Sequence, residues 1–593
     1  MIFQNRLLKS LLAIFLIWTF FTGIILTTAQ DLPPNEDLSL GASVFVFRSS
    51  GRTAQKRFVS ASRAKRTKTQ RVAATKKIRR QYENLAVVKT RRSRVKIAAP
   101  TVSAAPIDIK RKTPKEASLA LTGSGLYLYE QNEIDKSIDI YEEALELDAE
   151  NADAKLGLSD AYARKGGDLL EAEKPREAVY YFDQAIKNND KNSVAYSGLG
   201  EIHDALDDND KAIANYEKAL SLDAALTELN APLGVLYYQK NDLKRADELL
   251  SKSLSTNQGD FSTQYFLGLI RYKQNRYEDA RAALTQAKSL DETMPEVRLS
   301  LGEVLDKLDR EAEAIAEYKE AARLKPTYVD AWFYLGSAYY EQKKYEESIA
   351  AYKEAIKLKN DSGEAHANLA DAYRQLGKCG EANGSYSLAA AFIKDDAELY
   401  SNWGFCLGKV NKWDNAVMRL NQAIALSADH IDYTNLGWAL YNSAQVDLKS
   451  KREADAKTKL QQAKTALSKA VGMNQNFAPA QINLGITLND LGEYQAAVTA
   501  LKQANELRKN WLFAVNELGI AYRKLNDYGN AVKQFERAVE IDDKYAIGYF
   551  NLGEAQLRSG NAKGAKKSHE KLKKLNKNLA NALEVMILGA KLK

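Results

Sequence analysis

A glycine that recurs every 34 residues constrains the fold of this chain more than any other feature. Gly200, Gly234, Gly268, Gly302 and Gly336 are each 34 residues apart, and leucine precedes most of them. The series continues, with one alanine and one interruption, through Ala370, Gly404, Gly437, Gly485, Gly519 and Gly553. Self-similarity at a fixed period of this size indicates one supersecondary unit stacked many times.

The residue types within the unit indicate two helices. Trp332, Leu335, Gly336 and Tyr339 fall on one helical face, because 3.6 residues make a turn. A small residue follows the glycine by twelve positions, and a bulky residue follows by sixteen. Short polar breaks such as Gln274–Arg276 lie between these two groups and are typical of turns. The unit is therefore predicted to be a helix–turn–helix hairpin.

These motifs resemble the tetratricopeptide repeat (TPR) family. The segments Ala331–Ala355 and Asn516–Ala538 read close to the family pattern. We count about thirteen such units in residues 116–575, roughly four-fifths of the chain. The resemblance implies an all-α, right-handed solenoid of helix hairpins, with residues 576–593 as a C-terminal capping helix. It also implies protein partners rather than a small-molecule substrate.

The first thirty residues form a separate segment. Arg6 and Lys9 precede an apolar run from Leu11 to Leu26, and small residues lead to Gln30. This layout predicts a secretory signal peptide over residues 1–30, with an uncleaved membrane anchor as the alternative. Both place the repeats outside the cytoplasm. We expect the periplasm or envelope of a bacterium, with a secreted or a membrane-anchored protein as alternatives.

Residues 31–115 form a basic arm. They hold 22 Lys and Arg against 5 Asp and Glu, whereas the whole chain is only +8, so the repeats are net acidic. High charge with low hydrophobicity predicts disorder. The arm is either a solvated spacer or a segment that binds an anionic membrane or cell-wall polymer. Nucleic acid is a less favoured partner, because the arm has few aromatic residues that could stack on bases. Its main basic residues are Lys65, Arg66, Lys76, Lys77, Arg79, Arg80, Arg91, Arg92 and Arg94.

The sequence carries no recognisable catalytic motif. It has only four histidines and contains no zinc-binding His-Glu-x-x-His, no phosphate-binding Walker loop and no Gly-x-Ser-x-Gly elbow. We therefore expect no enzyme activity, no cofactor and no metal site. Cys379 and Cys406 are too few for a disulfide framework, and we interpret them as one packed residue and one exposed thiol, with a bridge in an oxidising compartment as the alternative.

Asparagine recurs two residues before the glycine slot in the C-terminal half. The series is Asn368, Asn402, Asn435, Asn483 and Asn551, with Asn516 displaced by one position. An amide there lies about 100° around the helix from the buried leucine and could grip the backbone of a bound peptide in the concave groove. The pattern is similar to the asparagine ladder of O-GlcNAc transferases. The alternative is that each asparagine bonds to a neighbouring helix.

Large apolar residues follow the glycine slot in the same repeats. They are Phe405, Trp438, Ile486 and Ile520. Apolar anchors beside polar groups favour a groove for peptide or helical segments, although packing between repeats would explain them equally well. We predict a non-catalytic interaction scaffold whose groove holds partner proteins. The alternative is an adaptor that binds an anionic surface through its arm, with the repeats as a spacer.

One interruption respects the helical period. The step from Gly437 to Gly485 is 48 residues, which exceeds the usual 34 by fourteen. Seven residues make about two helical turns. Both helices of this repeat are therefore predicted to be about seven residues longer than their counterparts.

Overall fold

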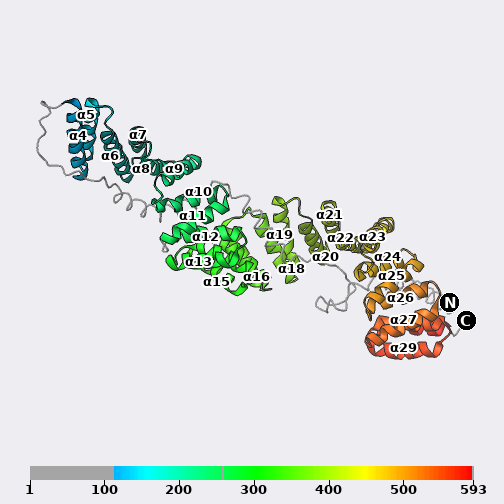
Figure 1. The fold of residues 1–593 in the computed structure, drawn as a ribbon. Coiled ribbons are helices and arrows are strands. Elements are labelled where there is room, and N and C mark those ends of the chain that lie inside the picture. Colours follow the sequence, from blue (N-terminus) through cyan, green and yellow to red (C-terminus); the bar gives the residue numbers. More distant parts are fainter. Residues whose placement is uncertain (1–112, 257–259, 591–593) are drawn as a thin grey trace. The chain divides into compact units, whose positions relative to one another are not determined.

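The computed structural model describes residues 113–256 and 260–590. The predicted signal segment and the arm up to residue 112 lie outside these residues, as do all nine of the arm's predicted basic residues. The described chain contains 27 α-helices, one short 3-10 helix, Thr227–Leu229, and no strand. Figure 1 draws these helices along the chain. The described residues fall into two compact units, 113–338 and 339–590, whose boundary lies inside one helix.

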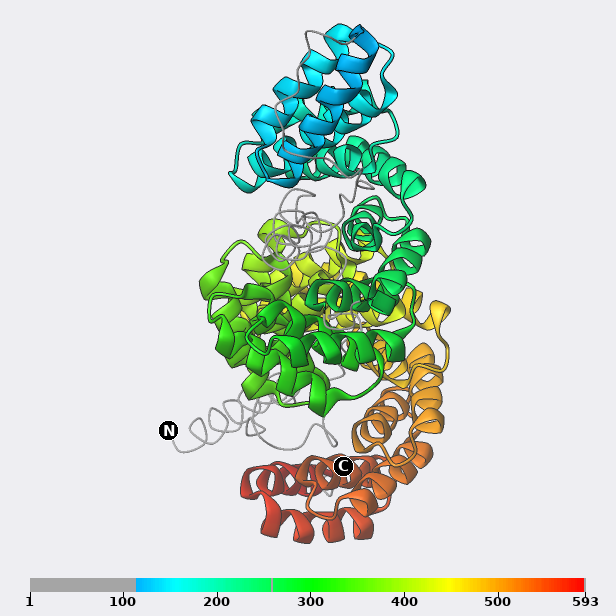
Figure 2. The same cartoon turned by 60° about the vertical axis from the view of Figure 1, so that its left-hand side comes forward.

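Consecutive helices pair as antiparallel hairpins in both units (Figure 2). The six hairpins of the first unit are α4 (Pro114–Glu130) with α5 (Ile134–Leu147), α6 (Ala152–Glu171) with α7 (Pro175–Asn188), α8 (Ser193–Ala205) with α9 (Asn209–Leu222), α10 (Asn230–Gln239) with α11 (Leu243–Thr256), α12 (Phe261–Lys273) with α13 (Tyr277–Leu290), and α14 (Pro295–Lys307) with α15 (Glu311–Leu324). Helix α16 (Val329–Glu341) contains the unit boundary.

The second unit continues the same order. Its helices are α17 (Tyr345–Leu358), α18 (Gly363–Gln375), α19 (Cys379–Phe392), α20 (Ala397–Lys409), α21 (Trp413–Leu426), α22 (His430–Lys449), α23 (Glu453–Met473), α24 (Ala478–Asp490), α25 (Tyr494–Leu507), α26 (Leu512–Lys524), α27 (Tyr528–Ile541), α28 (Ala546–Arg558), α29 (Ala562–Leu575) and α30 (Lys577–Ala590). Twelve hairpins thus lie within the two units, with α16, α17 and α30 as further helices, and this all-helical order confirms the predicted fold class.

The turn within each hairpin has one recurring backbone conformation. A residue with positive φ ends the first helix, for example Asn132 at 63° and Gly377 at 70°. The backbone of the first hairpin closes this turn by hydrogen bonds from Asn132 N to Tyr129 O (3.0 Å) and from Glu133 N to Leu128 O (2.9 Å). Asparagine and glycine tolerate the left-handed conformation best, which explains their frequency at this position.

The glycine slot lets the two helices of a hairpin approach closely. A Cβ atom on Gly200 would lie 2.6 Å from Tyr216 Cδ1, and one on Gly485 would lie 2.4 Å from Leu501 Cγ. Tyr216 and Leu501 are the bulky residues sixteen positions later, and both are buried. The 34-residue period thus reflects a contact in which a bulky side chain of the second helix packs against the glycine backbone of the first helix.

The lengthened repeat is confirmed. Helices α22 and α23 contain 20 and 21 residues, against 13 and 14 in the following pair, α24 and α25. Near the tip of the longer pair, the carboxylate of Asp447 is almost fully buried and pairs with Arg452 and with Lys459, whose Nζ lies 2.9 Å away. Burial of a charge is stable only when it is paired in this way.

Helix α30 completes the core of the last hairpin. Leu583 of α30 is fully buried, and its Cδ2 lies 2.5 Å from the place where a Cβ of Gly553 would be. In α29 the residue sixteen positions after this glycine is His569 rather than a bulky apolar side chain. The capping helix therefore supplies the apolar cover that the hairpin lacks.

The two cysteines form a disulfide, which corrects the interpretation of one packed and one exposed thiol. Cys379 begins α19 and Cys406 lies in α20, with 4.8 Å between their Cα atoms. Both side chains are buried, at 4% and 0% exposure. Sequence spacing missed the bridge because the two residues are brought together by the packing of consecutive hairpins.

Candidate partner-binding groove

The first helices of successive hairpins pack side by side in the second unit. They are α18, α20, α22, α24, α26 and α28, and each contacts the next first helix along the series. This row carries every residue that the sequence predicted for a partner-binding groove. We refer to the surface formed by these six helices as the first-helix face.

The asparagine series lies beneath this face rather than on it. Its six members are between 0% and 6% exposed. Asn551 Nδ2 donates to Asn516 Oδ1 at 3.0 Å, and Asn402 Nδ2 lies 3.4 Å from Asp371 Oδ1. These contacts join neighbouring first helices. At Asn551 and Asn516 the structure therefore agrees with the structural alternative, in which the asparagine bonds to the next helix.

Other members of the series have amide atoms without a partner. Neither amide atom of Asn368 or Asn483 forms a hydrogen bond within the described residues, and Asn402 Oδ1 also lacks a donor. An unpaired buried polar group costs about 1–3 kcal/mol of stability. Most buried polar groups in proteins are paired, so these amides require an explanation.

The four apolar residues are mostly part of the core. Phe405, Trp438 and Ile486 are 8%, 5% and 8% exposed, while Ile520 is partly buried. Trp438 and Ile486 share one apolar cluster, and Phe405 belongs to another. The indole of Trp438 also stacks on Tyr441, with 4.9 Å between ring centroids. Packing between repeats thus accounts for much of this series.

Sequence reasoning missed a polar group farther along the same helices. Gln445 Nε2 of α22 donates to Asp490 Oδ2 of α24 at 2.8 Å, and the hydroxyl of Tyr441 also bonds to Asp490. Asn489 Nδ2 of α24 donates to Glu517 Oε2 of α26 at 3.1 Å. We call these five residues the acidic cluster. Glu517 stands two residues before the glycine, where the neighbouring repeats carry asparagine. This exception to the asparagine pattern is the sequence feature that could have identified the cluster.

Both carboxyl groups of the cluster hold their protons more tightly than usual. Burial raises the pKa of Glu517 to about 7, against the pull of its hydrogen bond with Asn489. Burial also raises the pKa of Asp490, although its side chain reaches solvent. Neither carboxylate forms a salt bridge among the described residues. Arg523 acts on Glu517 and Lys524 acts on Asp490 only at longer range, and both lower the pKa of the carboxyl group.

The neighbouring basic residues are otherwise engaged. Arg523 pairs with Glu554, which also accepts from Arg558 Nη2 at 3.0 Å. Burial lowers the pKa of Arg523 to about 10, and burial and the two arginines lower the pKa of the exposed Lys524. The guanidinium of Arg523 thus forms its ion pair with Glu554, and it acts on Glu517 only through longer-range attraction.

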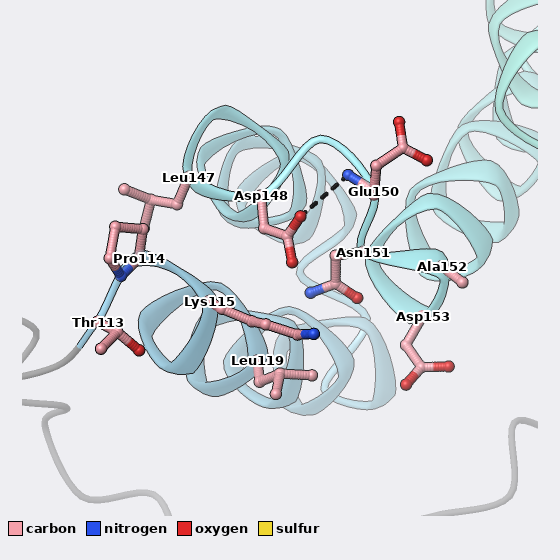
Figure 3. Close-up of a pocket in the computed structure, with 10 residues that line it drawn as sticks. All are labelled: Thr113, Pro114, Lys115, Leu119, Leu147, Asp148, Glu150, Asn151, Ala152 and Asp153. Carbon is pink, nitrogen blue, oxygen red and sulfur yellow. Dashed lines mark hydrogen bonds between the residues drawn. The ribbon is translucent and has the colours of Figure 1, made fainter.

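Two surface hollows lie away from the predicted residues. A pocket of about 550 Å³ in the first unit is lined by Lys115, Leu119, Asp148 and Asn151 among others (Figure 3). In that view Asp148 accepts a hydrogen bond from the backbone of Glu150, at 3.1 Å. A cleft of about 870 Å³ in the second unit lies between α21, α22 and α23. Neither hollow contains a member of the asparagine or apolar series.

The described part of the chain has neither a metal-binding cluster nor a membrane-spanning helix. No group of three His, Cys, Asp or Glu side chains there is placed to hold a metal ion. Across residues 113–256 and 260–590, no helix combines the length and apolarity that a membrane crossing needs.

Family models match the chain along most of the array. The model described as "TPR repeat" matches residues 312–343, 336–377 and 519–560. Two models described as "Tetratricopeptide repeat" match residues 122–173, 165–226 and 232–295, and residues 478–510. These segments span both units. A search of curated proteins found no match.

Three solved structures are similar to parts of this chain. The MamA protein is 25% identical over 28% of this chain and 91% of its own, with a TM-score of 0.27. YrrB is 24% identical over 31% and 95%, with a TM-score of 0.29. A tetratricopeptide repeat protein from Parabacteroides merdae is 17% identical over 44% and 99%, with a TM-score of 0.31.

The repeated hairpin, its glycine contact and the family matches lead to one assignment. TPR arrays are generally non-catalytic scaffolds for protein–protein interaction. The chain belongs to the tetratricopeptide repeat proteins.

Proposed function

We propose that the chain is an exported scaffold that holds peptide or helical segments of partner proteins on its first-helix face. The observation that carries this proposal is the unpaired state of the Asn368 and Asn483 amides. Each amide can offer one acceptor and two donor hydrogens, which is the complement of a peptide group. An apolar side chain of similar size would fill the same space without the cost of an unpaired amide.

Binding through these amides requires a small local adjustment, since Asn483 is fully buried without a partner. If the Asn483 side chain rotates, its amide can form a hydrogen bond with the backbone of a bound peptide, whereas in the interior it forms none. The acidic cluster is already accessible, because Asp490 is exposed and Glu517 is partly exposed. We therefore propose that a partner first contacts the cluster and is then held along the asparagine series.

Two features support export and a place in the cell envelope. The first is the basic start and apolar run of residues 1–30. The second is the bridge between Cys379 and Cys406, because disulfides persist in oxidising compartments and are rare in the cytosol. Neither feature depends on the other.

The adaptor function of residues 31–115 remains a second proposal. The charge imbalance of 22 basic against 5 acidic residues favours it. Attraction to anionic lipid or polymer would weaken steeply with salt, since the Debye length falls from about 10 Å at 0.1 M to about 3 Å at 1 M. Groove binding that depends on apolar contact would change much less.

The test uses the full chain from residue 31 and an array of synthetic twelve-residue peptides that varies every position. We expect selective binding that survives 0.5 M salt and is weakened by Asn483→Ala. Asn421→Ala is the matched control, because Asn421 is exposed on α21. Absence of any selected peptide would contradict groove binding, and binding only to anionic vesicles at low salt would favour the adaptor.

A further inference from the structure

We infer that the acidic cluster is a subsite for one positively charged side chain, lysine or arginine, of the bound segment. The inference rests on the proposed function and adds the chemistry of the partner to it. Its acceptors come from two consecutive first helices, α24 and α26, and α22 supplies the aromatic side. A ligand that crosses these helices would meet all of them together.

Hydrogen bonds within the cluster hold the acceptors together. Asp490 accepts hydrogen bonds from Gln445 and Tyr441 of α22, and Glu517 accepts a hydrogen bond from Asn489 of α24. Asp490 and Asn489 are adjacent in sequence, so the two held carboxylates are linked through one short stretch of α24. Carboxylates that are fixed by hydrogen bonds lose little entropy when a ligand binds.

A second and independent observation points to a donor ligand. Asn489 is only 8% exposed, and its Oδ1 has no hydrogen-bond partner within the described residues. Its Nδ2 is engaged by Glu517, so this amide lies within the cluster. An orphan acceptor beside two carboxylates matches a group with several N–H donors and no acceptor, such as a guanidinium or an ammonium.

The aromatic side of the cluster suits the same ligand. Trp438 and Tyr441 of α22 stack with an interplanar angle of 9°, and Tyr441 reaches Asp490. Trp438 is buried, whereas Tyr441 is partly exposed, so the methylene stem of lysine or arginine can lie along the Tyr441 ring while its charged end reaches the carboxylates. The partly buried Ile520 of α26 adds apolar surface on the following helix.

The positive charges already present do not fill the subsite. Arg523 is paired with Glu554, and Lys524 is exposed with no salt bridge among the described residues. The remaining groups that bear on Glu517 are Asp490, Asn489 and Asn516, none of which is a cation. Arg523 and Lys524 act on the two carboxylates only at longer range, so a cationic side chain would add the direct ion pair that neither carboxylate has among the described residues.

The experiment uses the full chain from residue 31 with the positional peptide array. We expect lysine and arginine to be selected at one position, with norleucine and glutamate rejected there. Asp490→Asn and Glu517→Gln should each weaken the selected lysine peptide at least about tenfold, since hydrogen bonds to charged groups contribute about 1.5–3 kcal/mol. The matched norleucine peptide should bind wild type and both variants within about twofold of each other.

The control variant is Glu536→Gln, which removes a charge from an exposed position on α27 and should change neither affinity. Both test variants keep the shape of the side chain and remove a charge that is costly where it stands, so they should melt no lower than wild type. Selected peptides without a basic preference would overturn this inference and leave the proposed function standing. No selected peptide at all would overturn both.

Discussion

Asn489 on α24 donates a hydrogen bond of 3.1 Å from its amide nitrogen to the carboxylate of Glu517 on α26. This contact links two successive first helices in the second unit. It also fixes the orientation of a carboxyl group whose pKa is raised by burial to about 7. The contact between α24 and α26 therefore includes a carboxyl group that titrates near neutral pH.

The stability of the chain should fall as pH rises from about 5 to about 7.5. The folded pKa of Glu517 lies above its unfolded value, so the folded state binds more protons in this window. The shift corresponds to at most about 3 kcal/mol. Asp490 acts in the same direction. Urea unfolding at both ends of the window should show a smaller pH dependence for Glu517→Gln, and an unchanged dependence would contradict the raised pKa.

Affinity for a lysine peptide should rise over the same pH range. Ionised Glu517 attracts the ammonium, and its deprotonation through pH 7 supplies that charge. The peptide keeps its own charge throughout, because lysine titrates near 10.4. Calorimetric titration at pH 6 and pH 8 measures the effect, and Glu517→Gln should remove most of it. Equal affinities for wild type would show that Glu517 does not contact the ligand.

Reduction of the disulfide should destabilise the second unit by about 3 kcal/mol, since closure of a 27-residue loop constrains the unfolded chain. Guanidinium unfolding with and without reductant measures the difference. The Cys379→Ala/Cys406→Ala variant serves as control and should not respond to reductant. Two titratable thiols in the unfolded, unreduced protein would show that the bridge is absent.

Gly485→Ala should lower the melting temperature, because the added methyl would lie 2.4 Å from Leu501 Cγ and the hairpin would have to open. The expected cost is about 1–3 kcal/mol. Gly472→Ala on α23 is the control, since nothing lies within 4 Å of its added methyl. It should be neutral or stabilising by up to about 1 kcal/mol. Equal melting of the two variants would contradict the close approach.

Asn483→Leu should separate a binding role from a structural one. The substitution removes an unpaired buried amide and keeps most of the side-chain volume, so the free energy of unfolding should be unchanged or higher. Affinity for a selected peptide should nevertheless fall by about 0.5–1.5 kcal/mol. Asn551→Leu is the comparison, because it removes the donor to Asn516 Oδ1 and should destabilise the fold. Higher stability with full affinity would assign Asn483 no role in binding.

Trp438→Ala tests the apolar series. Trp438 is 5% exposed within a core cluster, so its truncation should cost about 3–5 kcal/mol of stability. Packing between repeats, the second explanation of this series, accounts for a cost of this size. Chemical unfolding gives the stability, and peptide affinity should be compared at a temperature where both proteins are folded. A variant that melts like wild type would place the indole outside the core.

The sequence by itself determined the repeat. The 34-residue spacing indicated the hairpins, since in a repeat of regular length the glycine faces a bulky residue sixteen positions later. The extra fourteen residues after Gly437 predicted the lengthening of α22 and α23, because helical period and chain length are local properties. The turn residues with positive φ follow the same local logic, with asparagine the most frequent residue among them.

Only the tertiary structure decided which side chains meet between hairpins. Cys379 and Cys406 are 27 residues apart, Gln445 and Asp490 are 45 apart, and Asn489 and Glu517 are 28 apart. None of these separations equals the repeat, so no periodic pattern marks them. The burial of the asparagines was also hidden, because it depends on how closely successive first helices pack. Local spacing determines which face of a helix a residue occupies, whereas the neighbouring helix determines whether that face meets water, a partner or a second side chain.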